Sequence, residues 1–126
     1  MLFPLVGGLV ASLIKLWIYR LRPQSEYARI LIENGSASYP SSTVVMVILF
    51  FGFNIFLTCY LSRMSFLTKS TVWLVGIFMI LTVPIARIYV GAHWFTDVVG
   101  GAVLGLLLLL PVCFFYHKCR AIKPCK

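Results

Sequence analysis

The sequence predicts an all-α integral membrane bundle of about four transmembrane helices. Of its 126 residues, 61% are hydrophobic and only 11% are charged. The mean hydropathy of +1.00 lies well above that of soluble globular proteins. The apolar residues also gather into four stretches, each near the length that crosses a bilayer. We therefore expect a single membrane-embedded domain over residues 1–126.

The four stretches are residues 2–19, 43–61, 71–85 and 98–116. The third is short for a membrane span unless its helix continues through Arg87. In the fourth, Gly101 and Gly105 are four residues apart, which suits a small-residue face for close helix packing. Chance in a glycine-rich helix explains that pair equally well. Residues 20–42 form one long polar loop, either a connector or part of an entrance for a lipid headgroup.

Two cations lie near the end of the first stretch. Lys15 and Arg22 are seven residues apart, about two helical turns, so on a shared helix both would point the same way. Pro23 indicates that this helix ends nearby, because proline cannot continue the ladder and restricts the residue before it. Charge beside an apolar segment is costly and usually functional, which favours an anion site. The ordinary alternative is a pair of cations flanking a membrane helix.

A second polar string lies between the third and fourth stretches. Arg87 offers a planar fork suited to phosphate oxygens. His93 and Asp97 are spaced as i and i+4, so the carboxylate can hold one imidazole nitrogen and leave the other for attack or proton transfer. Both features also have an ordinary explanation. An arginine such as Arg87 near an apolar run is typically an anchor whose charged end reaches the membrane surface. His93 and Asp97 could form a hydrogen bond that is only structural.

A third string, Pro40-Ser41-Ser42-Thr43, precedes the second stretch. Serine before an apolar run is typical of a helix N-terminus, where it commonly serves only as a cap. The free N–H groups and the dipole of such a terminus also favour an anion. The order and spacing of the three strings together indicate an anion-binding site with a nucleophile.

The three strings resemble the type 2 phosphatidic-acid phosphatase family, integral-membrane lipid phosphatases related to vanadium haloperoxidases. The family pattern is Lys-x6-Arg-Pro, then Pro-Ser-Gly-His, then Ser-Arg-x5-His-x3-Asp. The first motif matches in full from Lys15 to Pro23, and the third matches from Arg87 to Asp97 with Ala86 in place of serine. The resemblance spans most of the chain.

The resemblance implies a role for each residue. His93 would be the nucleophile that forms a phosphohistidine, and Asp97 would orient and polarise it. No metal and no cofactor take part in that scheme. The phosphate would be held by side chains and backbone N–H groups of five residues: Lys15, Arg22, Ser41, Ser42 and Arg87.

The second motif departs from the family pattern. Thr43 stands where the family has histidine, and Ser42 where it has glycine; alternatively the histidine is deleted, because Thr-Val-Val often follows it in relatives. Either way the acid that should protonate the leaving alkoxide is missing, and a threonine hydroxyl is far too weak to replace it. His117 follows His93 by 24 residues, roughly 36 Å of helix, so we expect it at the opposite membrane face.

The cysteines favour neither a disulfide nor a metal site. Cys59 and Cys113 fall in apolar stretches, whereas Cys119 and Cys125 belong to a basic tail that we place in the reducing cytoplasm. With His117 the tail thiols lack a fourth ligand and a zinc-binding spacing.

The formal net charge of +8 is dispersed over helix ends, which does not favour a nucleic-acid partner. The positive-inside rule places the second loop and the tail in the cytoplasm. The catalytic loops of a cell (inner) membrane protein would then face the periplasm, the exterior or an organelle lumen. The cations behind this assignment are Arg63, Lys69, Lys118, Arg120, Lys123 and Lys126.

Family members usually have about six membrane helices, with the first motif at the end of the third, so this chain resembles the last four. A truncated reading frame, a compact variant and an engineered fragment are alternatives that the residues leave open. The residues also leave open which partners the chain has. Further N-terminal helices and a second copy in a homo-oligomer are the two alternatives.

The leading functional hypothesis is a membrane lipid phosphatase, a hydrolase of lipid metabolism. Its substrate would be phosphatidic acid, phosphatidylglycerol phosphate or a polyprenyl pyrophosphate, and the change at Thr43 would lower its activity. One alternative is a non-catalytic relative that binds lipid phosphate. Another is a small structural membrane protein.

Overall fold

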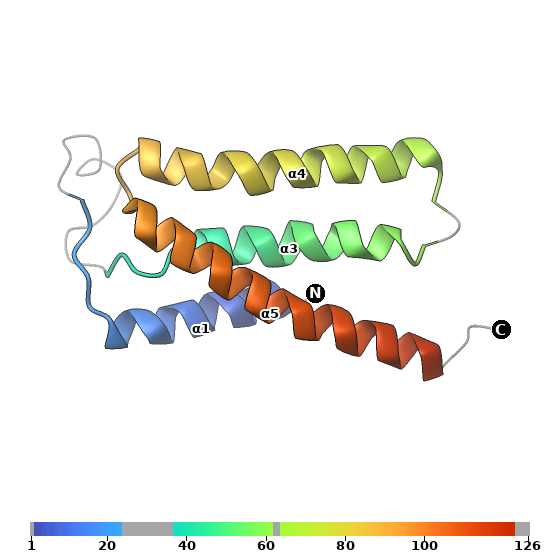
Figure 1. Ribbon diagram of the computed structural model, residues 1–126, viewed down its shortest axis with the longest axis horizontal. Helices are drawn as coiled ribbons and strands as arrows, with labels where there is room; N and C mark the ends of the chain where they lie inside the picture. Colours follow the sequence, from blue (N-terminus) through green and yellow to red (C-terminus); the bar gives the residue numbers. More distant parts are fainter. Residues whose placement is uncertain (1, 24–36, 62–63, 123–126) are drawn as a thin grey trace.

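The computed structural model describes residues 2–23, 37–61 and 64–122, and within them the chain forms four helices. The helices are α1 (Phe3–Trp17), α3 (Ser42–Thr58), α4 (Phe66–Tyr89) and α5 (Phe95–Ile122). The prediction of an all-α bundle of about four helices is confirmed (Figure 1). Part of the polar loop between the first two stretches and the end of the basic tail, with Cys125, lie outside the described residues.

The helix ends follow local signals. Pro4 occupies the first turn of α1, where its missing N–H costs nothing. Ser65 caps α4 by accepting a hydrogen bond from the backbone N–H of Thr68. At the start of α5, the Asp97 carboxylate accepts from the backbone N–H of Trp94, at 2.9 Å, as in a capping box.

The boundaries differ from the apolar stretches in three places. α1 ends at Trp17, so Arg22 is not on the same helix as Lys15, and the expectation of a shared helix is wrong. α4 continues through Arg87 to Tyr89, which gives the third stretch 24 residues, enough for a membrane span. α5 is longer than its apolar stretch and carries His117 near its far end.

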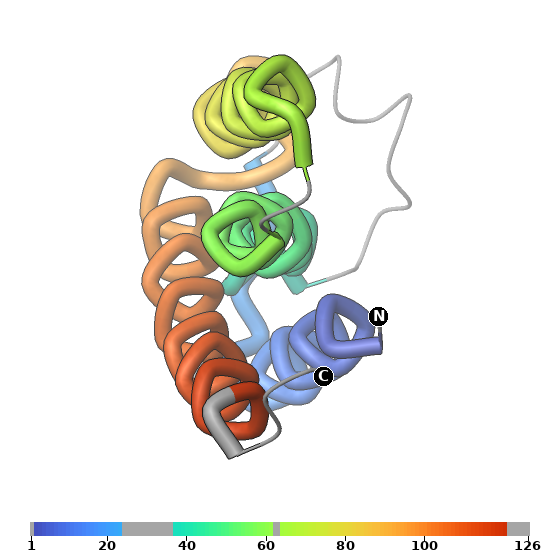
Figure 2. The backbone as a smooth tube through the Cα atoms, turned by 90° about the vertical axis from the view of Figure 1, so that its right-hand side faces the viewer, coloured from blue at the N-terminus to red at the C-terminus, as the bar shows by residue number. Residues whose placement is uncertain are grey.

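The central element of the bundle is α3, which packs against α1, α4 and α5 (Figures 1 and 2). Two small clusters form the core on its surface. Val45 and Leu49 pack with Ala11 of α1, and Val44 and Ile48 pack with Val98 of α5. The register of α3 therefore fixes how the other helices meet.

The small-residue face of α5 is confirmed. A Cβ atom at Gly101 would lie 2.7 Å from the backbone oxygen of Ser41, and one at Gly105 would lie 3.1 Å from the Cβ of Ile48. A side chain at either position would push α5 away from α3. The two glycines thus allow the start of α3 to lie directly against the first turns of α5.

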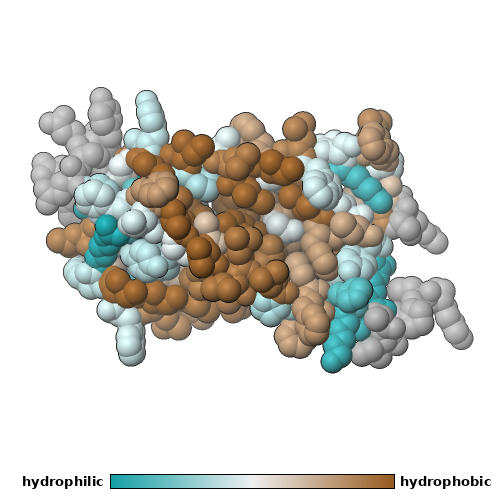
Figure 3. All heavy atoms as spheres, in the orientation of Figure 1, coloured by the Kyte–Doolittle hydropathy of each residue, from teal (hydrophilic) through white to brown (hydrophobic). Residues whose placement is uncertain are grey.

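Large apolar side chains cover the outside of the bundle, in a broad band between more polar ends (Figure 3). Among the described helices, α4 and the segment Phe95–Arg120 are long and apolar enough to cross a membrane, and α1 and α3 are shorter apolar helices. A soluble protein rarely exposes so large an apolar area. The predicted membrane character of the bundle is therefore visible in its surface.

Candidate active site

The residues of the three motifs meet at one end of the bundle. Lys15 lies in the last turn of α1 and Arg87 in the last turn of α4. Ser41 is the N-cap of α3, and Asp97 lies in the first turn of α5. These four helix ends lie on the left of Figure 1. The fold thus brings together side chains that are up to 82 positions apart in the sequence.

His93 lies in the turn between α4 and α5. The turn folds back on α4, because the backbone N–H groups of Ala92 and His93 both donate to the carbonyl of Arg87. Gly91 permits this geometry with a φ of 68°, a left-handed conformation that a side chain would strain. The imidazole is only 5% exposed. It is therefore held inside the site rather than at its rim.

The Nδ1 atom of His93 lies 2.9 Å from the backbone oxygen of Ser38. A carbonyl oxygen can only accept a hydrogen bond, so Nδ1 carries the proton and donates it. The lone pair of the neutral ring is then on Nε2. Burial, followed by the positive charges of Arg22 and Lys15, lowers the pKa of His93 to about 4. At neutral pH the ring is a neutral nucleophile among cations.

Asp97 does not hold His93 directly, contrary to the expected direct hydrogen bond. Its Oδ2 atom lies 3.8 Å from Nδ1 of His93, beyond hydrogen-bond distance. The reason is local, because His93 precedes α5 and the two residues are not one turn apart on a single helix. Asp97, which has no exposed surface, instead accepts from Trp94 and pairs with an arginine. Its influence on the imidazole is electrostatic and raises the pKa of His93.

That arginine is Arg20, which is none of the residues that define the three sequence motifs. Its Nη1 atom lies 3.0 Å from Oδ1 of Asp97 and also donates to the hydroxyl of Thr96. Its guanidinium lies over the Trp94 ring, with Cζ 5.5 Å from the ring centroid. The spacing of Arg20 and Arg22 was the available signal, because alternate residues of an extended segment share a side.

The segment from residue 18 to residue 23 acts as a strap across the site. The carbonyl of Arg20 accepts from the backbone N–H of Ser38 at 2.8 Å, and that of Leu21 accepts from the Trp94 indole N–H at 3.0 Å. Arg22 donates to the carbonyl of Ala92 at 3.0 Å. The strap therefore joins the segment before α3 to the turn before α5. It also explains how Arg22 reaches the site without being helical.

The site carries a strong excess of positive charge. Burial, followed by the charge of Arg87, lowers the pKa of Arg22, so the two guanidinium groups are close enough to repel each other. Among the described residues, the cations of the site face a single carboxylate, Asp97, which is already paired with Arg20. Such a cluster is costly unless an anion neutralises it. The cations are Lys15, Arg20, Arg22 and Arg87.

Ser41 contributes an unusual buried hydroxyl. The residue is fully buried, and its Oγ atom has no hydrogen-bond partner. It does not cap α3, although it occupies the N-cap position. Its own N–H is not free for an anion, because it donates to the carbonyl of Asp97 at 3.0 Å. An unpaired buried hydroxyl typically costs about 1–3 kcal/mol, which a bound anion oxygen would recover.

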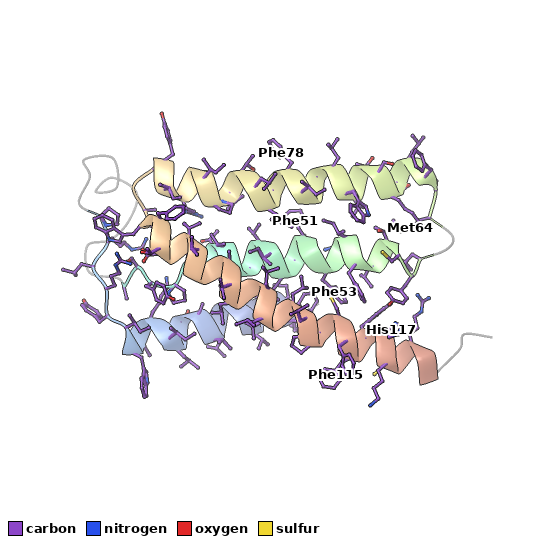
Figure 4. The ribbon with its side chains drawn as sticks, in the orientation of Figure 1. Phe51, Phe53, Met64, Phe78, Phe115 and His117 are labelled. Carbon is purple, nitrogen blue, oxygen red and sulfur yellow. The ribbon has the colours of Figure 1, made fainter. Side chains whose placement is uncertain are left out.

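The two other residues of the second motif begin α3. Ser42 is its first residue and Thr43 its second, and both are partly buried. Helix N–H groups at these positions have no acceptor within the helix, so they remain suited to an anion. The other histidine cannot act here. His117 lies toward the far end of α5 (Figure 4), where it hydrogen-bonds Tyr60, beyond the end of α3. His93 instead bonds Ser38, before the start of α3.

No group of three or more His, Cys, Asp or Glu side chains in the described part of the chain could hold a metal ion. The free thiols there, Cys59, Cys113 and Cys119, do not belong to the site. The polar groups of the site are one neutral imidazole, several cations, hydroxyl or N–H donors and one carboxylate, Asp97, which is already paired with Arg20. This set suits an oxyanion with several oxygens, such as phosphate.

Comparison with known proteins gives a consistent result. Residues 2–121 match the PAP2 superfamily. Phosphatidylglycerophosphatase B of Bacillus subtilis (strain 168) is 35% identical over 121 residues, which cover 91% of this chain and 55% of that protein. The crystal structure of a transmembrane PAP2-type phosphatidylglycerolphosphate phosphatase from B. subtilis matches with a TM-score of 0.73 and 30% identity. This second match covers 99% of the chain and 59% of the solved structure, so the chain spans somewhat over half the length of these relatives.

Proposed function

Because this integral membrane chain belongs to the PAP2 superfamily, we propose that it is a metal-independent phosphatase of phosphate-bearing membrane lipids. The observation that carries the proposal is the buried, neutral His93, with Nδ1 bound to a carbonyl and several cations around the ring. The domain that acts is residues 1–126 as a single membrane-embedded unit. The candidate substrates are phosphatidic acid, phosphatidylglycerol phosphate and polyprenyl pyrophosphate, the second being the lipid named in the relatives.

The proposed reaction has two steps. Nε2 of His93 attacks phosphorus, the bond to the leaving lipid oxygen breaks, and a phosphohistidine forms. Water then attacks phosphorus, the P–N bond breaks, and inorganic phosphate leaves with the imidazole regenerated. Lys15, Arg22 and Arg87 offset the charge on the phosphoryl oxygens in both steps, with donors from Ser41 and Ser42. The leaving lipid oxygen takes its proton from water, because Thr43 replaces the family histidine.

The proposal is tested by phosphate release from the three lipids by purified protein in detergent. We expect release from at least one lipid, and the rate should not change when a chelator is added, because fixed cations supply the charge that a metal would supply. A strict requirement for added Mg²⁺ or Zn²⁺ would contradict the proposal.

A second candidate function, lipid-phosphate binding without catalysis, follows from the threonine at position 43. Without a leaving-group acid, the chain could bind lipid phosphate and turn over too slowly to matter. Tungstate binding without measurable release from any lipid would favour this binding role. Failure to bind tungstate would leave only a structural role.

The membrane orientation belongs to the same proposal. The site faces the non-cytoplasmic side, since Lys69, Lys118 and Arg120 gather at the opposite end. Labelling of Cys119 by a membrane-impermeant thiol reagent in intact cells would reverse this assignment, because the thiol is exposed on the protein.

Arg20 has a positioning role in this scheme, since it neutralises Asp97 beside His93. We expect Arg20→Gln to raise the pKa of His93 from about 4, because the carboxylate would act on the imidazole without its counter-charge. A protonated imidazole cannot attack, so the acid limb of kcat/KM should move to higher pH. NMR titration of the imidazole gives the same quantity without turnover.

Arg20→Lys is the matched control, because it keeps the charge next to Asp97 and loses the planar contact with Trp94. Its acid limb should stay close to that of the parent. If both variants yield less folded protein but keep the parental pH profile, Arg20 only stabilises the strap and does not influence the pKa of His93.

A further inference from the structure

Two aromatic side chains at the site end of the bundle are almost completely exposed. Trp17 is 94% exposed and Tyr89 is 90% exposed, the two highest values among the exposed large hydrophobic residues of the described chain. Trp17 is the last residue of α1, and Tyr89 is the last residue of α4. The proposed reaction uses neither side chain, so their exposure needs a separate explanation.

Both rings combine an apolar body with a polar atom that the protein leaves unused. The two other tryptophans of the chain, Trp73 and Trp94, donate their indole N–H groups within the protein. In the described part of the chain, no hydrogen bond satisfies the indole N–H of Trp17 or the hydroxyl of Tyr89. Rings of this kind concentrate at the level of the lipid headgroups, where the body meets hydrocarbon and the polar atom meets water.

Each ring lies two residues after a cation of the phosphate site. Lys15 precedes Trp17 in this way, and Arg87 precedes Tyr89. Two residues of an α-helix differ by about 200° around its axis and by about 3 Å along it. Both cations are partly buried and act through their charges on the site, whereas both rings are open to the surroundings. Cation and ring therefore point to opposite sides of the helix at almost the same depth.

The two rings lie on separate flanks of the bundle. α1 and α4 pack on different sides of α3 and do not contact each other (Figure 2). They also differ in length, with 15 residues in α1 and 24 in α4, so their lengths alone would place them at different depths. An aromatic ring at the site end of each helix gives both flanks the same reference level. Two separated points also limit the tilt of the bundle.

We propose that Trp17 and Tyr89 are interfacial anchors that bind the headgroup layer of the bilayer and hold the phosphate site at the depth of the lipid phosphates. The partner is the lipid surface itself, and both rings are positioning residues that act through the depth of Lys15 and Arg87. The inference rests on the proposed function for the ligand, a lipid phosphate. The depth of the site can be measured without turnover.

The measurement uses Trp94, which directly precedes the first turn of α5 and follows His93. In a Trp73→Phe background, any replacement of Trp17 leaves Trp94 as the only tryptophan of the chain. Its fluorescence is recorded in vesicles of phosphatidylcholine that carries bromine at different positions of its acyl chains. The bromine position that quenches most strongly reports how deep the site lies.

Trp17→Tyr keeps an amphipathic ring, so Trp94 should be quenched mainly by bromine close to the headgroups. Leucine prefers hydrocarbon, so the combination of Trp17→Leu with Tyr89→Leu should let the site sink, and quenching by deep bromine should increase. The matched control combines Trp17→Tyr with Phe66→Leu, which removes an aromatic ring that is 81% exposed at the opposite end of α4. It should give the same quenching profile as Trp17→Tyr alone.

Phosphate release gives a second readout. In vesicles that contain phosphatidic acid, the double leucine variant should show a KM about 5-fold higher than Trp17→Tyr, with kcat unchanged, because the clamp lies less often at the phosphate level. In detergent micelles both values should be equal, since a micelle adapts to the protein. Circular dichroism should show the same helix content in all variants, because both rings are exposed and do not pack in the core.

An unchanged quenching profile in the double leucine variant would overturn the anchor assignment, whatever its activity. An equal change caused by Phe66→Leu would also overturn it, because the loss of any exposed ring would then suffice. The same holds for a change of oligomeric state confined to the leucine variant, because the rings would then contact a second copy. If the depth changes as expected but the parent releases phosphate from no lipid, the proposed function fails and the anchors stand.

Discussion

Replacement of His93 by alanine should reduce phosphate release to the level of a protein-free control, because the covalent step then has no nucleophile. The geometry supports so large an effect, because His93 is the one imidazole that the described residues place in the site, and its Nε2 carries the free lone pair. The measurement is initial phosphate release under single-turnover conditions, where slow product release cannot hide the chemical step.

His117→Ala is the matched control for this experiment. It also removes an imidazole, but that ring bonds Tyr60 at the opposite end of the bundle. Its rate should equal that of the parent. His93→Ala should still bind tungstate, because Lys15, Arg22 and Arg87 remain in place. Release that persists at the parental rate in His93→Ala would assign the chemistry to another group.

The positions of the helices could be predicted well because they follow from single-residue hydropathy summed over a span. Even so, the end of α1 was misplaced, since the residues from Ile18 to Leu21 are apolar or amphipathic and resemble a continuing helix. The contacts of the strap decide otherwise. Ser38 and Trp94 bond its backbone carbonyls, and a helix would leave those oxygens bonded to its own next turn. Contacts with distant segments thus end the helix where local helix preference would continue it, and such contacts cannot be read from the neighbouring residues.

For the site, too, some features could be predicted from the sequence and others could not. The order and spacing of the motifs indicated one common site, and the fold places its charged residues and its histidine at one end of the bundle. These residues are Lys15, Arg22, Arg87, His93 and Asp97. It could not show that a backbone carbonyl, that of Ser38, orients the imidazole. Any residue has a carbonyl, so no residue type marks that role. Likewise Arg20 meets Asp97 across 77 positions of sequence, a pairing that only the folded chain reveals.

The largest gain in rate should come from histidine at position 43. A general acid typically contributes about 10² to 10⁴ in rate, and the chain has a threonine where the family pattern has that acid. We expect Thr43→His to raise release from lipid monophosphates by about 10²-fold. Release from diphosphate lipids should rise less, because a leaving phosphate is already a stable anion and needs the proton less. Thr43→Asn is the control, since it adds a polar side chain of moderate size that cannot protonate an alkoxide at neutral pH.

The structure also distinguishes the two ways of aligning the second motif. Val44 and Val45, directly after Thr43, are fully buried against α5 and α1, and α3 is the central helix. An inserted residue between Ser42 and Thr43 would either rotate this core face by about 100° or displace Ser41 from the site. We therefore expect the substitution to gain activity and the insertion to lose folded protein or tungstate binding. If the insertion gains activity and the substitution does not, the family histidine was deleted and the segment directly before α3 absorbs the extra residue. If neither gains activity while both bind tungstate, the missing acid does not limit the reaction, and catalysis depends on groups outside residues 1–126.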